Sequence, residues 1–483
     1  MSKPKSISVN SVWYLIYQVF NVIFPFITTL YAGRILLPEG VGRVISAQNI
    51  ATYFALLAFL GIPTYGRREI AKAQNNKIQL SKVYSELLVI NGVSTFVFLV
   101  LYIGLILTVR DFRADLPLYL VVGSAIALNF LNNSWFFEGI EDFKFISIRN
   151  IIFKAGAFLL LVLLVHDTSD YLIYALLTVL GTAGNYILNV FYAPRYVRFT
   201  LRDLNLRRHM EPIFALLAVN IAIELYSLVD VTMIRFLVGE ENVAFYSYAN
   251  GINKILQQVI NTFTIVVVPR LTLYYKESRQ EEFNALLSKT LNAIFVLALP
   301  MICGVEVVAS TAIIALYGNE YAASIPVLRF LIVLLMVSPV GYLLGSRVLL
   351  VVGKERLMAR CVWAGAIVNI IGNFILIPMF YERGAAMASI LSELCVAAVY
   401  FLLGRKYFKL SLYASEIWKV LIAAVLMSVV SYFIGFVTDV LLIRLIIQIV
   451  AGVAVYGIVL KLTSERMVVE YGNRVIGKVL KKT

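Results

Sequence analysis

The segment Ser247–Asn261 reads SYANGINKILQQVIN and opens an apolar run that continues to Val268. An α-helix rises about 1.5 Å per residue, so a run of this length crosses the roughly 30 Å hydrocarbon layer of a bilayer. The segment nevertheless contains three asparagines, two glutamines and a lysine. At about 100° per residue, Asn250, Lys254, Gln257 and Asn261 share one side of the helix. The sequence therefore predicts a membrane-spanning helix with one polar face.

The composition of the whole chain is that of a membrane protein. Hydrophobic residues make up 61% of the 483 residues and charged residues 14%, and the mean hydropathy is +0.86. Soluble domains average about 45–50% apolar and about 25% charged residues. The apolar runs lack period-2 alternation, which favours helices over a barrel. We therefore predict an all-α polytopic membrane protein with fourteen transmembrane helices, at 11–32, 43–62, 83–107, 117–137, 147–165, 171–193, 212–236, 244–268, 286–308, 325–349, 357–380, 385–404, 415–436 and 440–460.

The net charge of +14 is explained by topology rather than by nucleic acid. If Met1 is cytoplasmic, most Lys and Arg residues outside the spans lie on the cytoplasmic side. The exceptions, on the opposite side, are Arg34, Arg110, Arg113 and Arg383. The positive-inside rule predicts this asymmetry, so we expect both termini to be cytoplasmic. Basic stretches such as 195–209 then orient the protein and contact lipid headgroups, and no nucleic-acid partner is expected.

The sequence offers no candidate for catalysis or metal binding. The three cysteines, Cys303, Cys361 and Cys395, all lie inside apolar spans, and the two histidines, His166 and His209, lie in loops. These positions predict neither disulfides nor a metal cluster. No GxxxxGK[ST] motif is present, so nucleotide hydrolysis by this chain is not expected. We predict a protein that is not an enzyme and needs no cofactor, with H⁺ or Na⁺ as a coupling ion.

The spans divide into two sets of six and an appendix. The polar link at 194–211 separates an N-lobe (1–194) from a C-lobe (195–410), followed by two more spans (411–461) and a basic amphipathic tail (462–483). A weak repeat at an offset of 202 pairs Glu39 with Glu241 and Ala47 with Ala249. Six spans separate the copies, so both copies have the same orientation in the membrane. This is a parallel repeat of the kind found in transporters.

Polar residues also align on three further spans. The first span carries Tyr14, Gln18, Asn21, Pro25 and Thr28, the second carries Gln48, and the seventh carries Asn220, Glu224, Ser227 and Asp230. Two alternatives stay open: hydrogen bonds of about 0.6–2 kcal/mol each between neighbouring helices, and a structural ion pair between Glu224 and Lys254. Because an ionisable residue costs about 2.5–3.5 kcal/mol at the centre of a membrane helix, four polar faces favour a water-filled central cavity. Pro25 removes a backbone hydrogen bond and predicts a kink.

Five stretches resemble one family of membrane proteins. They are 24–72 (FPFITTLYAGRILLPEGVGRVISAQNIATYFALLAFLGIPTYGRREIAK), 132–156 (NNSWFFEGIEDFKFISIRNIIFKAG, with a Trp-x-x-x-Gly core), 229–252, 315–331 and 343–359. They resemble the Wzx-type bacterial polysaccharide flippases, a branch of the superfamily that includes multidrug exporters and the lipid II flippase. The resemblance covers nearly the whole chain. It departs at Val41-Gly42, followed by Arg43, where the family often has Tyr-Gly.

The resemblance implies two six-helix lobes around a central cavity in the bacterial cytoplasmic membrane. It implies a substrate, an oligosaccharide repeat unit on undecaprenyl pyrophosphate, that moves from the cytoplasmic to the outer leaflet by alternating access. The product is a surface polysaccharide such as capsule or O-antigen. Membrane lipids, a polysaccharide polymerase and glycosyltransferases are the implied partners.

Within that hypothesis, three kinds of side chain have expected roles. Cations replace the solvation of the pyrophosphate, amides bind sugar hydroxyls, and carboxylates exchange H⁺ or Na⁺. The cations are Lys254, Arg34, Arg43, Lys154 and Arg270; the amides are Asn250, Gln257, Asn261, Gln18, Asn21 and Gln48; the carboxylates are Glu224 and Asp230. Tyr14 and Trp135 are candidates for stacking on sugars. For the boundary arginines and Trp135 the alternative is interfacial anchoring, and for Lys154 it is snorkelling towards the membrane surface.

Two other functions compete with this hypothesis. A cation-coupled multidrug antiporter has the same superfamily fold but needs a cavity of net negative charge. A membrane-embedded polysaccharide polymerase or O-acyltransferase needs catalytic residues on sizeable outer loops, and the outer loops here are short.

Overall fold

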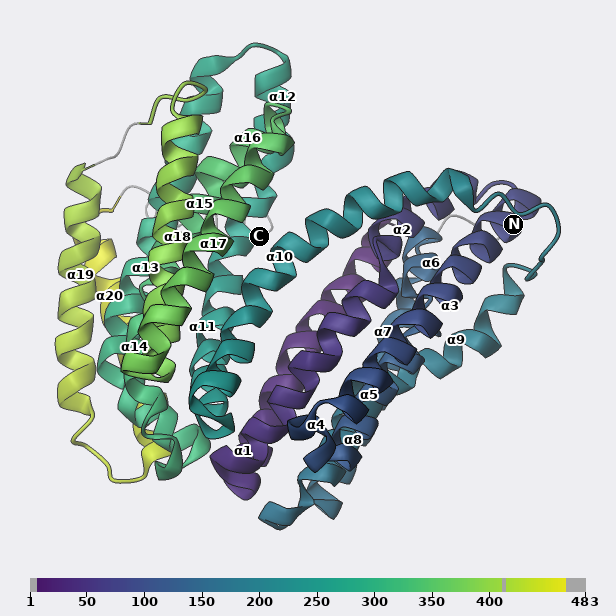
Figure 1. Ribbon diagram of the computed structural model, residues 1–483. Helices are drawn as coiled ribbons and strands as arrows, with labels where there is room; N and C mark the ends of the chain where they lie inside the picture. The colour runs from purple at the N-terminus through teal and green to yellow at the C-terminus, as the bar shows by residue number, and fades with distance from the viewer. Residues whose placement is uncertain (1–6, 411–413, 466–483) are drawn as a thin grey trace. The chain divides into compact units, whose positions relative to one another are not determined.

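The computed structural model describes residues 7–410 and 414–465 (Figure 1). Contacts divide the chain into two compact units, Met1–Ala244 and Phe245–Thr483. This boundary lies after α10 (Arg207–Val238), whereas the predicted lobes divide at 194/195. The predicted amphipathic tail lies largely outside the described residues.

The first unit is all helical over its described residues. Its elements are α1 (Ile7–Phe59), α2 (Ile62–Ala73), α3 (Lys77–Thr108), α4 (Arg110–Ala114), α5 (Leu116–Asn129), α6 (Ser134–Gly139), α7 (Phe143–Leu164), η1 (Thr168–Asp170), α8 (Tyr171–Thr182), η2 (Gly184–Tyr186), α9 (Ile187–Tyr192), η3 (Ala193–Arg195) and α10, with the start of α11 (Glu240–Val266). Helix α1 packs along α3, α5, α7, α8 and α10. It is therefore the central element of the unit.

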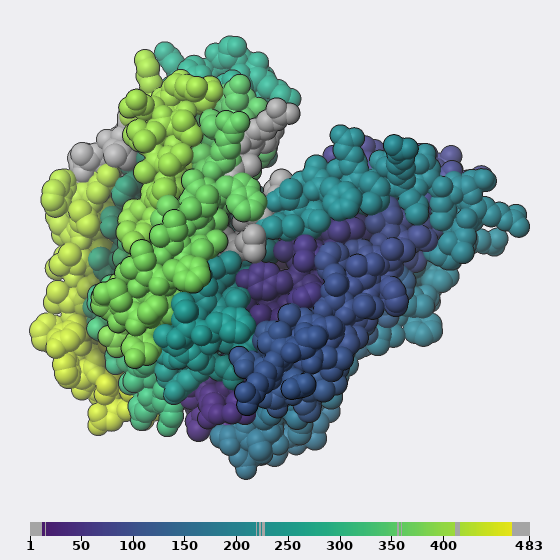
Figure 2. Space-filling model, viewed as in Figure 1, coloured from purple at the N-terminus to yellow at the C-terminus, as the bar shows by residue number. Residues whose placement is uncertain are grey.

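The second unit is also all helical over its described residues. Its elements are the rest of α11, α12 (Val268–Lys276), α13 (Gln280–Tyr317), η4 (Asn319–Tyr321), α14 (Ser324–Leu331), α15 (Leu334–Gly341), the π-helical turn η5 (Tyr342–Arg347), α16 (Val348–Val351), α17 (Glu355–Phe380), α18 (Glu382–Gly404), α19 (Ala414–Ile434) and α20 (Leu441–Leu462). Helices α17 and α18 form an antiparallel pair, and α13 packs against both α19 and α20. The helices α13–α18, mostly green, form a closely packed surface in Figure 2.

The helices have the length and the surface expected of membrane spans. Twelve segments of the described chain are long and apolar enough to cross a bilayer, and the first, Val12–Ala73, contains both halves of the bent α1. Helix α10, of 32 residues, is a further long helix. The fold is therefore compatible with the fourteen predicted spans. Large apolar side chains face outward, including Leu163 (67% exposed) and Phe433 (66%). Such a surface is stable in lipid rather than in water.

Helix α1 bends at Leu37, between the first two predicted spans. Leu37 has φ 58° and ψ 174°, whereas Pro25 keeps helical backbone angles. The kink predicted at Pro25 stays a prediction, since a proline can bend the axis of a helix while its backbone angles stay helical. Leu37 precedes Pro38, and the pyrrolidine ring disfavours the α conformation in the residue before it. The two helical halves of α1 therefore meet at Leu37, inside the link predicted at 33–42.

Just after this bend, α1 passes very close to the start of α11. A Cβ atom at Gly42 would lie 1.9 Å from the carbonyl oxygen of Glu240. We expect Gly42→Ala to displace this contact and lower the stability of the protein by about 1–3 kcal/mol, as overpacking typically does. Thermal unfolding in detergent measures the loss. Gly104→Ala is the matched control, because a Cβ there meets nothing within 4 Å, and equal stability of the two variants would contradict the prediction.

Candidate functional site

A cavity of about 370 Å³ opens inside the first unit, between α1, α5, α7 and α8. Small residues make the space, because large side chains at the same positions would fill it. These residues are Ala51, Ala55, Ala125, Ala157 and Gly181. A Cβ at Gly181 would come within 3.0 Å of the Cβ of Ala157, so these two positions bring α7 and α8 together.

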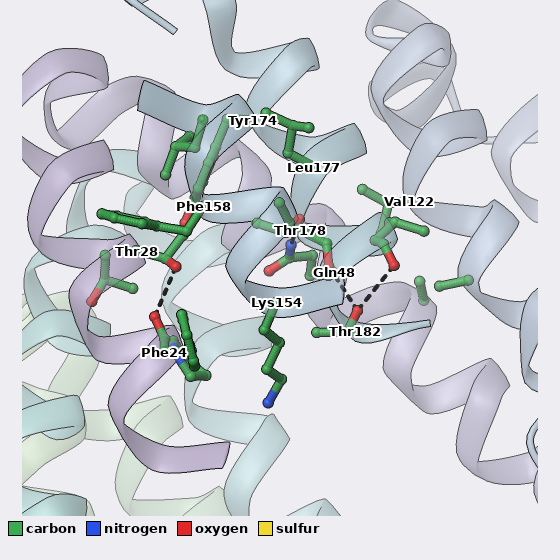
Figure 3. Close-up of a pocket in the computed structure, with 18 of the residues that line it drawn as sticks. Phe24, Thr28, Gln48, Val122, Lys154, Phe158, Tyr174, Leu177, Thr178 and Thr182 are labelled. Carbon is green, nitrogen blue, oxygen red and sulfur yellow. Dashed lines mark hydrogen bonds between the residues drawn. The ribbon is translucent and has the colours of Figure 1, made fainter. Parts of the chain in front are cut away.

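The walls of the cavity carry hydroxyl and amide groups (Figure 3). Gln48 donates to the Thr178 hydroxyl at 2.7 Å, and Thr178 itself donates to the carbonyl of Ala175 at 2.7 Å. Thr28 and Thr182 donate to carbonyls of their own helices, each one turn back. A hydroxyl that donates in this way keeps acceptor capacity. The cavity can therefore accept hydrogen bonds from a ligand that carries O–H or N–H groups.

Lys154 is the only Lys, Arg, Asp or Glu among the described residues that line this cavity. Its amino group donates to Asn21 Oδ1 at 2.6 Å, and Asn150 donates to the same oxygen at 3.3 Å. In Figure 3 its side chain extends away from the Gln48–Thr178 pair. The structure thus brings together three residues that the sequence placed on separate spans: Asn21, Gln48 and Lys154. Their role in substrate binding stays a prediction.

We expect Lys154→Met to lower transport at least tenfold. Methionine keeps much of the apolar stem but removes the charge, and a hydrogen bond to a charged group contributes about 1.5–3 kcal/mol. Transport by purified protein in proteoliposomes measures the loss. Lys144→Met, an exposed site on the same helix, is the control. Unchanged transport by Lys154→Met would assign this lysine to snorkelling alone.

The other predicted residues of the first unit lie in different settings. Gln18 is exposed and donates to Tyr14 Oη at 2.6 Å. Arg43 pairs with Glu39 at 2.6 Å and with Glu240 at 3.7 Å, which favours its role as an anchor. Arg34 is exposed, Glu224 is half-buried and Asp230 is buried.

The α11 residues lie on the outer side of the second unit. Asn250, Gln257 and Asn261 are half-buried, Lys254 is exposed, and Arg270 is exposed on α12. The side of α11 next to this stripe is the buried one, with Ala249, Asn253, Ile260 and Thr264. No described residue hydrogen-bonds to the side chain of Asn250, Lys254 or Gln257. Among the described residues of this unit, therefore, these side chains have no hydrogen-bond partner on a neighbouring helix. The Glu224–Lys254 ion pair would join the two units and stays a prediction.

Sequence reasoning missed a buried arginine. Arg149 is 2% exposed and donates to Asn189 and, at 2.6 Å, to Ser134. The signal was present: Arg149 stands inside an apolar run, and Asn185 and Asn189 are spaced one helical turn apart. Trp135 is also only 2% exposed. The alternative given for its ring, an anchor in the interfacial aromatic belt, is therefore wrong.

These features define a class: a polytopic helical membrane protein with polar groups inside its membrane region and helix-packed units of the kind used by transporters. A family model described as "Polysaccharide biosynthesis protein" matches residues 7–275, which is more than half of the chain. The chain belongs to this family.

Relatives extend the match over most of the chain. A "Putative O-antigen transporter" of Escherichia coli K12 is 23% identical over 403 residues, which is 81% of this chain and 94% of the relative. The fold is similar to that of the lipid II flippase MurJ in an inward closed conformation, with a TM-score of 0.71 and 16% identity over 95% of this chain and 99% of that one. It is also similar to an inward-facing multidrug resistance MATE transporter, with a TM-score of 0.62 and 17% identity over 79% of this chain and 93% of that one.

Proposed function

We propose that this protein is a flippase that moves lipid-linked oligosaccharides from the cytoplasmic to the outer leaflet of the bacterial cytoplasmic membrane. Undecaprenyl pyrophosphate is the proposed carrier, and a surface polysaccharide such as capsule or O-antigen is the product. The observation that carries the proposal is membership of the polysaccharide biosynthesis family. The name of the Escherichia coli relative, an O-antigen transporter, supports the substrate class.

The chemistry of the exposed α11 face supports the same proposal. A lipid-linked oligosaccharide has an anionic, hydrated head that must avoid hydrocarbon, whereas its tail belongs in lipid. Lys254 supplies an unpaired cation within the described chain, and Asn250 and Gln257 beside it supply amide groups. Since unsatisfied polar groups against lipid cost several kcal/mol, such a face needs water or a polar ligand. In our proposal it binds the head while one unit rocks against the other.

A direct test is reconstitution. Purified protein in proteoliposomes should transfer a short lipid-linked oligosaccharide between leaflets, as measured by its accessibility to a glycosidase added outside. Heat-inactivated protein is the control. Failure to move the glycolipid, with correct insertion demonstrated, would contradict the proposed function.

We further propose that Glu224 couples transport to H⁺ or Na⁺. The Glu224→Gln variant keeps the shape of the side chain but cannot exchange a proton. We expect it to lose the acceleration that an imposed pH or Na⁺ gradient gives to the wild type, with at least a tenfold lower gradient-driven rate. Glu211→Gln, at an exposed position of the same helix, is the matched control. A gradient response equal to that of the wild type would remove Glu224 from coupling.

The second candidate function is a multidrug antiporter, which the structural likeness to the MATE transporter keeps open. Cationic drugs require negative charge in the path. The charged groups that the structure places in the cavity and on the α11 face are instead lysines, Lys154 and Lys254. Efflux of cationic dyes by proteoliposomes without any glycolipid transfer would favour this alternative.

A further inference from the structure

The first unit contains a second, more polar cavity of about 170 Å³. It lies between the start of α1, the N-terminal part of α7, the short helix α6 and the turn η2, and all its lining residues fall between Tyr17 and Tyr186. Tyr17, Asn132 and Glu138 are half-buried, whereas Trp135, Arg149 and Asn185 are buried. The cavity thus has a partly open side and a closed interior.

The stretch 132–156, noted above for its Trp-x-x-x-Gly core, builds most of this cavity. It contributes six of the eleven lining residues. Two glycines hold it in place by close contact: a Cβ at Gly66 would meet the ring of Trp135 at 2.6 Å, and a Cβ at Gly139 would meet Ile70 at 2.6 Å. The indole of Trp135 is therefore fixed against α2 by packing.

Arg149 gives the cavity a buried positive charge. Its partners Asn189 and Ser134 are neutral, and within the described chain no carboxylate lies within ion-pair distance of it. The nearby carboxylate of Glu138 is instead paired with Arg67 on α2 at 3.2 Å. The rings of Phe145 and Tyr186 lie 5.3 Å and 5.9 Å from the guanidinium carbon. These contacts orient the guanidinium but do not neutralise its charge. A buried charge that is not neutralised costs free energy unless a further partner compensates for it.

Four residues around the cavity keep a buried polar atom without a hydrogen-bond partner. Two are donors, Arg149 Nε and Trp135 Nε1, and two are acceptors, Asn150 Oδ1 and Asn185 Oδ1. Unsatisfied buried polar atoms are uncommon and need an explanation. The set contains both donors and acceptors, the combination that the hydroxyl groups of a sugar ring complement. The aromatic residues Tyr17, Trp135 and Tyr186 supply apolar faces of the kind found in ligand pockets.

We propose that this cavity binds one sugar ring of the transported saccharide. The inference rests on the proposed function for the identity of its ligand. The size agrees with one ring, because pockets for larger, drug-sized molecules occupy about 300–1,000 Å³. Asn150 also donates to Asn21, which binds Lys154 at the edge of the larger cavity. The polar chain Asn150–Asn21–Lys154 thus connects the ring site with the larger cavity.

The test measures the fluorescence of Trp135, which lines the cavity. Replacing Trp13, Trp363 and Trp418 by phenylalanine leaves Trp135 as the only tryptophan of the chain. This variant, in lipid nanodiscs, is titrated with glucose, N-acetylglucosamine and glucuronic acid at millimolar concentrations. We expect a saturable change in emission for at least one sugar. Adding Asn150→Ala or Glu138→Gln should weaken that binding at least tenfold. Arg67→Gln, which breaks the same surface ion pair from outside the cavity, should leave it within twofold.

The outcomes separate the site from the proposed function. No saturable change with any sugar, together with normal glycolipid transfer by Asn150→Ala, would overturn the site and leave the flippase in place. The cavity would then hold only water. Equal weakening by Glu138→Gln and Arg67→Gln would also overturn it, because the effect would then come from the surface ion pair. Sugar binding without glycolipid transfer by the wild type would support the site and contradict the proposed function.

Discussion

Replacing Lys254 with alanine is expected to abolish surface polysaccharide while the protein still inserts into the membrane. Lys254 is exposed on the polar side of α11 and has no ion-pair partner among the described residues. A helix does not keep such a residue for stability, since its insertion costs about 2.5–3.5 kcal/mol. A lysine bound to a pyrophosphate forms charge-assisted hydrogen bonds of about 1.5–3 kcal/mol each. The loss of two such bonds corresponds to at least a hundredfold lower affinity for the substrate.

The measurement is complementation of a strain that lacks the gene, with polymer at the cell surface and protein in the membrane fraction assayed together. Lys254→Arg keeps the charge and should restore part of the polymer. Lys276→Ala, an exposed lysine at the end of α12, is the matched control. Normal polymer from the Lys254→Ala strain would remove this residue from the mechanism.

Replacing Glu86 with alanine is expected to destabilise the first unit by about 3 kcal/mol. The side chain of Glu86 is completely buried in α3 and accepts from Arg208, from His209 Nε2 at 2.9 Å and from the backbone N–H of Asn205 at 2.7 Å. His209 is buried too, and its Nδ1 lies 2.8 Å from the hydroxyl of Tyr65. Removing one partner of a buried ion pair costs about 3–5 kcal/mol. Arg208 is partly exposed, so in the variant its guanidinium can be solvated by water. We therefore expect a loss of stability at the low end of this range.

Thermal unfolding in detergent and proteolysis of the 196–206 segment both measure this effect, because Glu86 joins that segment to α3. Glu69→Ala is the control: Glu69 pairs with Lys72 at 2.8 Å on the surface of α2, and such pairs contribute about 0–1 kcal/mol. Similar unfolding temperatures for the two variants would show that the Glu86 cluster does not hold the segment in place.

Much of the fold was accessible from hydropathy, because a bilayer forces each spanning segment to be long, apolar and helical. The same reasoning failed at local features. It gave a link of residues 33–42 between the first two spans, although only Leu37 in it has non-helical backbone angles. It placed His209 in a loop, although His209 lies in α10 and is buried. In both places the outcome depends on contacts or dihedral angles that a sliding window of residues does not contain.

Of the candidate site residues too, the sequence identified some and missed the partners of others. Helical periodicity found the stripe of Asn250, Lys254 and Gln257, because residues three and four apart share a side whatever the tertiary structure is. It could not find the partners of Asn21 or Arg149. Asn21 and Lys154 are separated by 133 residues, and Arg149 and Asn189 by 40.

The sequence alone determined the membrane setting, the helical class and the family resemblance, since composition and local motifs carry all three. Only the tertiary structure decided which polar groups have a partner within the protein and which have none among the described residues. Periodicity gives the direction of a side chain on its own helix, but a hydrogen bond also requires the position of a second helix. That position is set by packing, as where the small residues Ala157 and Gly181 let α7 and α8 approach.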